Sequence, residues 1–134
     1  MVVLIMGILA SVAMPQYFKS VEKSRSAEAV NALSAIVDAQ ERAYMQAGSY
    51  VTKVGLLKDL DIGVSNFSYF TVMSIMALNT ATSAYYARMG RTESAGGGLG
   101  SYVIYLYYPQ VPGTGARTWD CTPTSAGCKS FLPQ

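Results

Sequence analysis

The two cysteines are the residues whose type and spacing point most directly to chemistry. Cys121 and Cys128 are the only cysteines of the chain, and the segment between them contains a proline and a glycine. A disulfide between them would close a loop of about eight residues and stabilise the fold by roughly 2.5 kcal/mol in the chain-entropy model. The alternative is a pair of free thiols in a reducing compartment. The spacing excludes a C-x-x-C redox motif. We therefore expect a structural disulfide that faces an oxidising space.

Residues for catalysis or metal binding are scarce. The chain has no histidine, which removes the commonest general base and metal ligand. Two cysteines cannot supply a four-thiolate zinc site. The acidic residues form no catalytic pair, although calcium near Asp59 and Asp61, or near Asp120, remains a weaker alternative. We expect no enzymatic activity, no cofactor, no metal and no small-molecule substrate.

Two short motifs have plainer explanations than a binding site. Gly96, Gly97, Gly98 and Gly100 are not followed by the Lys-Ser or Lys-Thr of a phosphate loop, so we expect a flexible hairpin loop. The segment 66–68 fits an N-glycosylation sequon, but such matches are frequent by chance.

Charge and aromatic content argue for packing rather than nucleic-acid binding. Ten basic and eight acidic residues give a net charge of +2, too small to make nucleic acid an obligate partner. Many of the ten tyrosines fall in strand-like segments, where they could form a stacking platform or an electron-hopping chain. We favour packing on the faces of a sheet. Charged residues make up 13% of the chain, against about 25% in an average soluble domain. This composition indicates a packed or assembling structural protein.

The chain begins with an apolar segment, and 1–18 contains no charged residue. Its most apolar part, 1–14, would be about 21 Å long as a helix, whereas a membrane span needs about 20 residues. A cleaved signal peptide would need a basic start, and the first basic residue is Lys19. A buried core helix is a second alternative. We favour the end of a membrane helix whose first turns lie upstream of Met1.

Helical sequence continues without interruption to the first clear stop. The segment 19–47 lacks glycine and proline, and its apolar residues recur every three or four positions. Gly48 is a natural helix end, while Pro15 and Gly7 should kink or locally open the helix. We predict one helix of about 47 residues, roughly 70 Å long. A globule of this size has a radius of gyration near 14 Å, so the front half must protrude into lipid or other subunits.

These patterns divide the chain into three parts: a hydrophobic helix segment at 1–18, the amphipathic half of the same helix at 19–48, and a globular head at 49–134. Runs at 66–77, 82–89 and 101–108 are rich in aromatic and β-branched residues and predict an antiparallel three-stranded sheet. A short helical turn is expected near 56–60. The tail at 109–134 is expected to lack regular structure. The predicted fold is α+β, with the sheet packed on the back half of the helix.

The N-terminal third resembles the first helix of bacterial type IV pilins and their type II secretion relatives. The residues that carry the resemblance are Gly-Ile-Leu-Ala at 7–10, Pro-Gln-Tyr at 15–17 and the helical run that ends at Tyr50. Beyond Tyr50 the match is architectural: a small sheet and a loop bounded by cysteines. The family begins with a leader ending in Gly and a mature start such as Phe-Thr-Leu-Ile-Glu. Neither precedes Val2 here, so we expect the methylated first residue and its glutamate to lie upstream.

The resemblance implies roles for individual residues. Cys121 and Cys128 correspond to the pair that staples the C-terminal loop in many pilins. Gly7 and Pro15 are where the helix would melt in the filament. Small residues allow close helix packing. The residues expected to pack in the filament core are Val3, Leu4, Ile5, Ile8, Leu9, Val12 and Met14. The residues expected to form ion pairs between subunits are Lys19, Glu22, Lys23, Arg25 and Glu28.

Three functions compete. The leading hypothesis is a major pilin, a structural subunit that polymerises with identical copies into a type IV pilus for adhesion, twitching motility or DNA uptake. It would be held in the bacterial inner membrane before the pilus assembly machinery moves it to a filament outside the cell. The first alternative is a minor pilin or a type II secretion pseudopilin. The second is a membrane-anchored monomeric binding module, which predicts no filaments.

Overall fold

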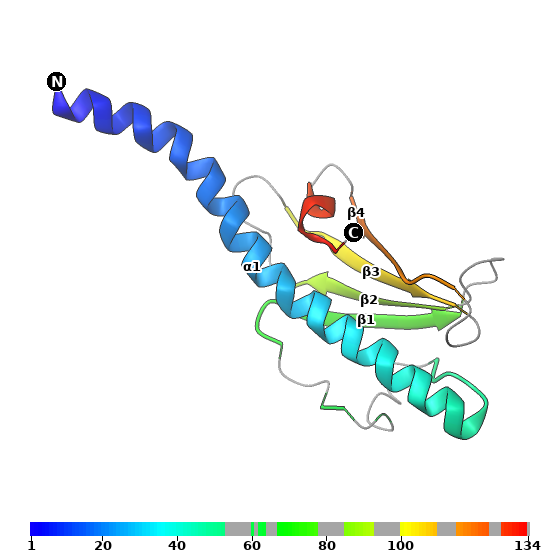
Figure 1. The fold of residues 1–134 in the computed structure, drawn as a ribbon. Helices are drawn as coiled ribbons and strands as arrows, with labels where there is room; N and C mark the ends of the chain where they lie inside the picture. Colours follow the sequence, from blue (N-terminus) through cyan, green and yellow to red (C-terminus); the bar gives the residue numbers. More distant parts are fainter. Residues whose placement is uncertain are drawn as a thin grey trace.

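The computed structural model describes residues 1–52, 60, 62–63, 67–77, 85–92, 100–109, 115–123 and 127–133. A long helix, α1 (Val2–Ala47), carries a four-stranded antiparallel sheet on its C-terminal half. The N-terminal half of α1 projects from the head without covering the sheet (Figure 1). The predicted α+β fold, with a protruding helix and a packed small sheet, is confirmed.

The helix ends where the sequence predicts. Gly48 adopts a left-handed conformation with φ 69°, and its N–H donates to the carbonyl oxygen of Tyr44 at 2.8 Å. Glycine takes this conformation without the steric cost that a Cβ would add. The helix stays continuous through Gly7 and Pro15 in the single chain, although its projecting half curves (Figure 1). Opening at these two residues in a filament therefore stays a prediction.

The two halves of α1 differ in burial. Residues 1–20 are all exposed. From position 22 onward, one stripe of the helix packs against the sheet, because its small and apolar residues recur every three or four positions. The buried members of this stripe are Glu22, Ser26, Ala29, Ala32, Leu33, Ile36, Val37, Ala39 and Gln40.

The sheet has one more strand than the sequence predicted. Its order is β1 (Phe70–Ala77), β2 (Tyr85–Arg91), β3 (Val103–Tyr108) and β4 (Thr118–Thr122). β1 and β3 lie within two of the predicted runs, and β2 overlaps the third but continues two residues beyond it to Arg91. The expectation that the tail lacks regular structure is wrong, since it contains β4 and the 3-10 helix η3 (Cys128–Phe131). The segment that forms β4 is short and lies among turn-forming residues, so its own sequence does not predict a strand. Its hydrogen-bonded pairing with β3 makes it one.

The disulfide joins these two elements of the tail. Cys121 in β4 is bonded to Cys128 at the start of η3, with 6.3 Å between their Cα atoms. Both cysteines are completely buried against the core. The predicted disulfide-bounded C-terminal loop is thus confirmed, and it pins η3 to the edge of the sheet.

Three predicted features lie wholly or mainly outside the described residues: the helical turn near 56–60, the glycine-rich loop at 96–98, and the aspartates at 59 and 61. Of the sequon at 66–68, only Phe67 and Ser68 are described. Among the described residues, no group of three acidic or cysteine side chains could hold a metal ion.

Candidate functional site at the junction of the helix and the head

The projecting half of α1 presents an apolar surface on all sides. Each of the seven residues predicted to pack in a filament core has between 56% and 83% of its surface exposed. By length and composition α1 could cross a membrane, and the 18-residue window that meets this test is not buried by the rest of the chain. An uncharged helix face of this size has a strong tendency to leave water.

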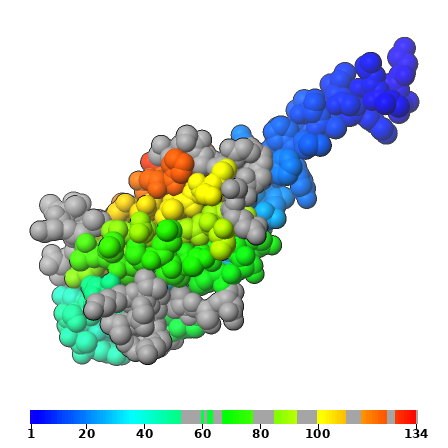
Figure 2. All heavy atoms as spheres, turned by 180° about the vertical axis from the view of Figure 1, so that it is seen from behind, coloured from blue at the N-terminus to red at the C-terminus, as the bar shows by residue number. Residues whose placement is uncertain are grey.

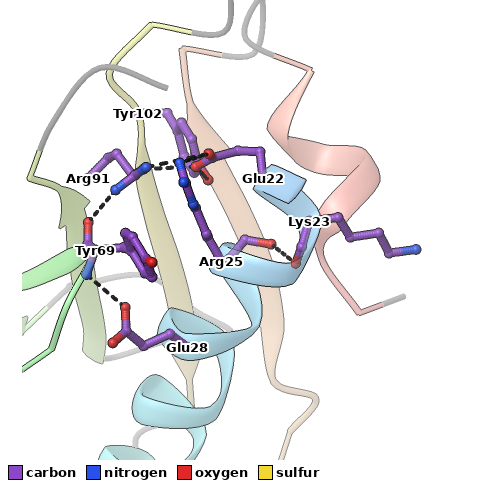
Figure 3. Close-up of polar contacts among 8 residues, drawn as sticks. Glu22, Lys23, Arg25, Glu28, Tyr69, Arg91 and Tyr102 are labelled. Atoms are coloured by element: carbon purple, nitrogen blue, oxygen red, sulfur yellow. Dashed lines mark hydrogen bonds and ion pairs between the residues drawn. The ribbon is translucent and has the colours of Figure 1, made fainter. Parts of the chain in front are cut away.

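A buried ionic cluster lies where α1 enters the head (Figure 3). Glu22 is only 2% exposed, and its Oε1 accepts hydrogen bonds from Arg91 Nε and from the Tyr102 hydroxyl, both at 2.8 Å. Arg91 ends β2 and Tyr102 directly precedes β3, so the cluster ties the helix to two strands. Burial, followed by the bond to Glu22, raises the pKa of the Tyr102 hydroxyl, which therefore stays a donor near neutral pH.

Glu28 extends this connection by about 1.7 turns along the helix. Its carboxylate accepts hydrogen bonds from the backbone N–H groups of Ser68 and Tyr69, at 2.7 and 3.0 Å. Arg91 Nη1 donates to the carbonyl oxygen of Tyr69 at 2.9 Å. The chain entering β1 is therefore fixed from both sides, by an acid of α1 and a base of β2 (Figure 3).

The basic residues at the junction are more accessible. Arg25 lies 3.8 Å from the Glu22 carboxylate, keeps 37% of its side chain exposed, and has its guanidinium 4.8 Å from the ring centroid of Tyr69. Lys19 and Lys23 are exposed. Val21, Ser24, Arg25, Glu28 and Tyr69 line an open groove of about 390 Å³ beside this cluster. The groove therefore has basic residues beside it, while Glu22 is buried in the head and Glu28 lies in the groove wall with its carboxylate bound to the backbone of Ser68 and Tyr69.

The far end of the amphipathic half is held by a second set of polar contacts. Gln40 is fully buried and forms two hydrogen bonds with the backbone of Val51, at 2.6 and 2.8 Å. Arg117, just before β4, lies 2.8 Å from Asp38 and 3.0 Å from Glu41. The helix is therefore fastened to the head at both ends of its buried stripe.

The five charges predicted to pair between subunits thus fall into two groups. Glu22, Glu28 and Arg25 have partners within the subunit, Arg25 while staying partly exposed, whereas Lys19 and Lys23 are exposed. Sequence reasoning missed Arg91 and Tyr102 as partners of Glu22, because they lie 69 and 80 residues away along the chain. The one available signal was an acid at a position that continues the buried helical stripe.

The long helix, its exposed apolar half and the disulfide-pinned sheet define the architecture of a type IV pilin. The family described as "Type IV minor pilin ComP, DNA uptake sequence receptor" matches residues 15–97, which is more than half of the chain. The chain belongs to this family of pilins, as the resemblance of its first helix implied. Neither the curated proteins nor the solved structures contain a match.

Proposed function

We propose that this chain is a minor pilin, which enters a type IV pilus through the projecting half of α1. The observation that carries the proposal is the exposed, uncharged surface of residues 1–18, which the chain cannot cover itself. Lipid covers this surface before assembly, and neighbouring helices cover it in the filament. The description of the matched family favours a minor pilin over the major subunit that the sequence first suggested.

The predicted roles of the helix residues belong to this proposal. The seven residues predicted for the filament core, which lie between positions 3 and 14, pack against neighbouring helices there. Gly7 and Pro15 let the helix open locally, because proline lacks an amide donor and glycine weakens the helix. The assembly machinery moves the subunit from the inner membrane to the extracellular filament.

Lys19, Lys23 and Arg25 are the residues we assign to ion pairs between subunits. Lys19 and Lys23 are exposed just beyond the apolar segment and Arg25 is partly exposed, so an acidic group of a neighbouring subunit can reach all three. Glu22 and Glu28 have the different task of fixing the head to the helix. Lys19→Glu and Lys23→Glu should therefore reduce the amount of chain in sheared filaments without lowering the thermal stability of the subunit. Incorporation equal to wild type in both variants would contradict this assignment.

The first experiment uses the native protein. Filaments sheared from cells would be examined by negative-stain microscopy, and their subunits quantified by peptide mass spectrometry that includes the N-terminal peptide. A minor pilin should be present at a small fraction of the main subunit, with a methylated residue upstream of Met1. An abundance equal to the main subunit would restore the major-pilin hypothesis. A chain found only in membranes, never in filaments, would favour the anchored binding module.

DNA is a second candidate partner, and one observation favours it: the matched family is described as a DNA uptake sequence receptor. The small net charge argues in the other direction, because affinity for DNA comes largely from basic residues that neutralise phosphates. Fluorescence anisotropy with labelled duplex DNA over a salt series would test it. A receptor should bind one sequence more tightly than its scrambled version at the same salt concentration.

A further inference from the structure

The tyrosines of the sheet occupy both of its faces. On the inner face, toward α1, Tyr50 contacts Tyr85 and Tyr108, with ring centroids 4.6 and 5.4 Å away. On the other face, three half-buried tyrosines contact one another at centroid distances of 5.8 to 6.0 Å. We call these three the outer tyrosine cluster: Tyr86, Tyr105 and Tyr107. The inner tyrosines are part of the hydrophobic core. The outer tyrosine cluster lies on the opposite face of the sheet, so the core does not need it for packing.

Charged residues flank the outer tyrosine cluster in the same row of the sheet. Arg88 of β2 pairs with Tyr105 of β3, which pairs with Asp120 of β4. Arg88 Nε donates to Ser74 Oγ at 2.6 Å, and Asp120 Oδ1 lies 3.0 Å from Lys129 Nζ. The Arg88 guanidinium with its several N–H donors, the Tyr105 ring and the Asp120 carboxylate thus lie side by side on this face. The face is turned toward the viewer in Figure 2.

Other polar groups lie at the edges of these rings. The Tyr86 hydroxyl donates to Met76 Sδ at 3.0 Å, and Thr122 Oγ1 donates to the Tyr105 hydroxyl at 3.3 Å. Partial burial raises the pKa of Tyr107, and the nearby carboxylate of Asp120 raises it further. The face therefore combines ring surface with hydroxyl groups that can donate and accept hydrogen bonds.

The charge of this face excludes some ligands. Among the described residues, the charged side chains of this face are Arg88 and Asp120. Lys129 of η3 reaches the face and forms an ion pair with Asp120. A polyanion such as nucleic acid needs several basic contacts along its backbone. A ligand rich in hydroxyl groups needs donors and acceptors in similar number, as Arg88 and Asp120 provide. Its C–H groups are attracted to aromatic faces, which carry negative charge density.

The shape of this face narrows the choice. The outer tyrosine cluster consists of half-buried side chains spread over β2 and β3 on one face of the four-stranded sheet, whereas small ligands are usually bound in concave sites. A flat, extended chain can cover a sheet face without a pocket. We propose that the outer tyrosine cluster, with Arg88 and Asp120, binds a neutral polysaccharide of β-1,4-linked pyranose rings. The proposal goes beyond incorporation into a pilus and does not depend on which class of pilin this is.

Binding would be tested by titrating the full chain, held in lipid nanodiscs, with cellohexaose in a calorimeter. Nanodiscs avoid detergents with sugar headgroups. Tyr107→Ala and Arg88→Ala should each weaken binding about tenfold, because loss of a central tyrosine or arginine anchor has effects of this size. Tyr107→Phe keeps the ring and should stay within about twofold of wild type. Tyr17→Ala is the matched control, since this tyrosine is 66% exposed on the projecting helix, away from the sheet.

Three results would overturn the proposal. The first is no heat of binding for wild type. The second is unchanged affinity in a Tyr105→Ala, Tyr107→Ala double variant that keeps the wild-type thermal midpoint. The third is binding of single-stranded oligothymidine through the same tyrosines without binding of cellohexaose, which would assign the face to nucleic acid. None of these results affects the filament measurements, so the two proposals fail independently.

Discussion

Glu22 is a carboxylate almost completely removed from water, and its stability depends on its partners. Arg91 and Tyr102 both donate to it. Removing one partner of a buried ion pair leaves the other charge uncompensated, at a cost of about 3–5 kcal/mol. We expect Arg91→Ala to lower the unfolding free energy by this amount, and Glu22→Gln to lower it as well, because the Arg91 guanidinium, 3% exposed, would then lie buried beside a neutral amide.

Thermal unfolding of the full chain in nanodiscs, followed by circular dichroism, would measure this loss. Lys23→Ala is the matched control, since it removes an exposed charge from the next position of the same helix and should change stability by less than about 0.5 kcal/mol. Equal midpoints for Arg91→Ala and Lys23→Ala would show that the buried cluster does not hold the head.

Tyr50 gives the subunit a dependence on alkaline pH. Burial, followed by the nearby Glu41, raises its pKa from 10.0 to about 12. A group with a raised folded-state pKa keeps its full stabilising effect below the unfolded value and loses it as pH rises through the folded value. The contribution of Tyr50 to the unfolding free energy should therefore be steady below pH 10 and fall between pH 10 and about 12. In Tyr50→Phe this fall should be smaller, while Tyr17→Phe, on an exposed tyrosine, should behave as wild type.

At the scale of elements, sequence reasoning succeeded where the signal is local. The helix was predictable because its apolar stripe repeats and Gly48 ends it. The first three strands carry enough aromatic and β-branched residues to be recognised. The strand β4 was missed because Thr118–Thr122 is short, and its pairing with β3 is a tertiary effect. The interior role of Glu22 was missed for a related reason, since its partners are distant in sequence.

The disulfide holds β4 and η3 together, so its removal should act on the edge of the sheet. Cys121→Ser with Cys128→Ser should lower the unfolding free energy by roughly 2.5 kcal/mol, as estimated for a loop of this length. Hydrogen exchange should show faster exchange in β4 than in β2, which lies between two strands. Reduction of the wild-type disulfide should have the same effect, with the reduced and reoxidised protein as the control. Unchanged exchange in β4 after reduction would contradict the view that the disulfide holds β4 in place.

At the scale of the whole molecule, the exposed apolar half of α1 makes the subunit depend on lipid or on neighbouring helices to cover it. We expect Leu9→Lys to impair membrane insertion, because a lysine near the centre of a membrane helix costs about 2.5–3.5 kcal/mol. Cell fractionation would detect less chain in the membrane and in filaments. Met45→Lys, at an exposed position beyond the projecting half, is the control and should fractionate as wild type. Normal membrane levels of Leu9→Lys would argue that lipid does not cover this helix.

The fastening of α1 to the head has a mechanical consequence. Polar contacts join the helix to the sheet near Glu22, at Glu28, and again at Asp38 and Glu41. When the helix is pulled along its axis, these contacts are strained in shear and share the tension, instead of opening one after another as in a peeled hairpin. A head attached in this way should resist axial force far better than a force that lifts the sheet sideways from the helix.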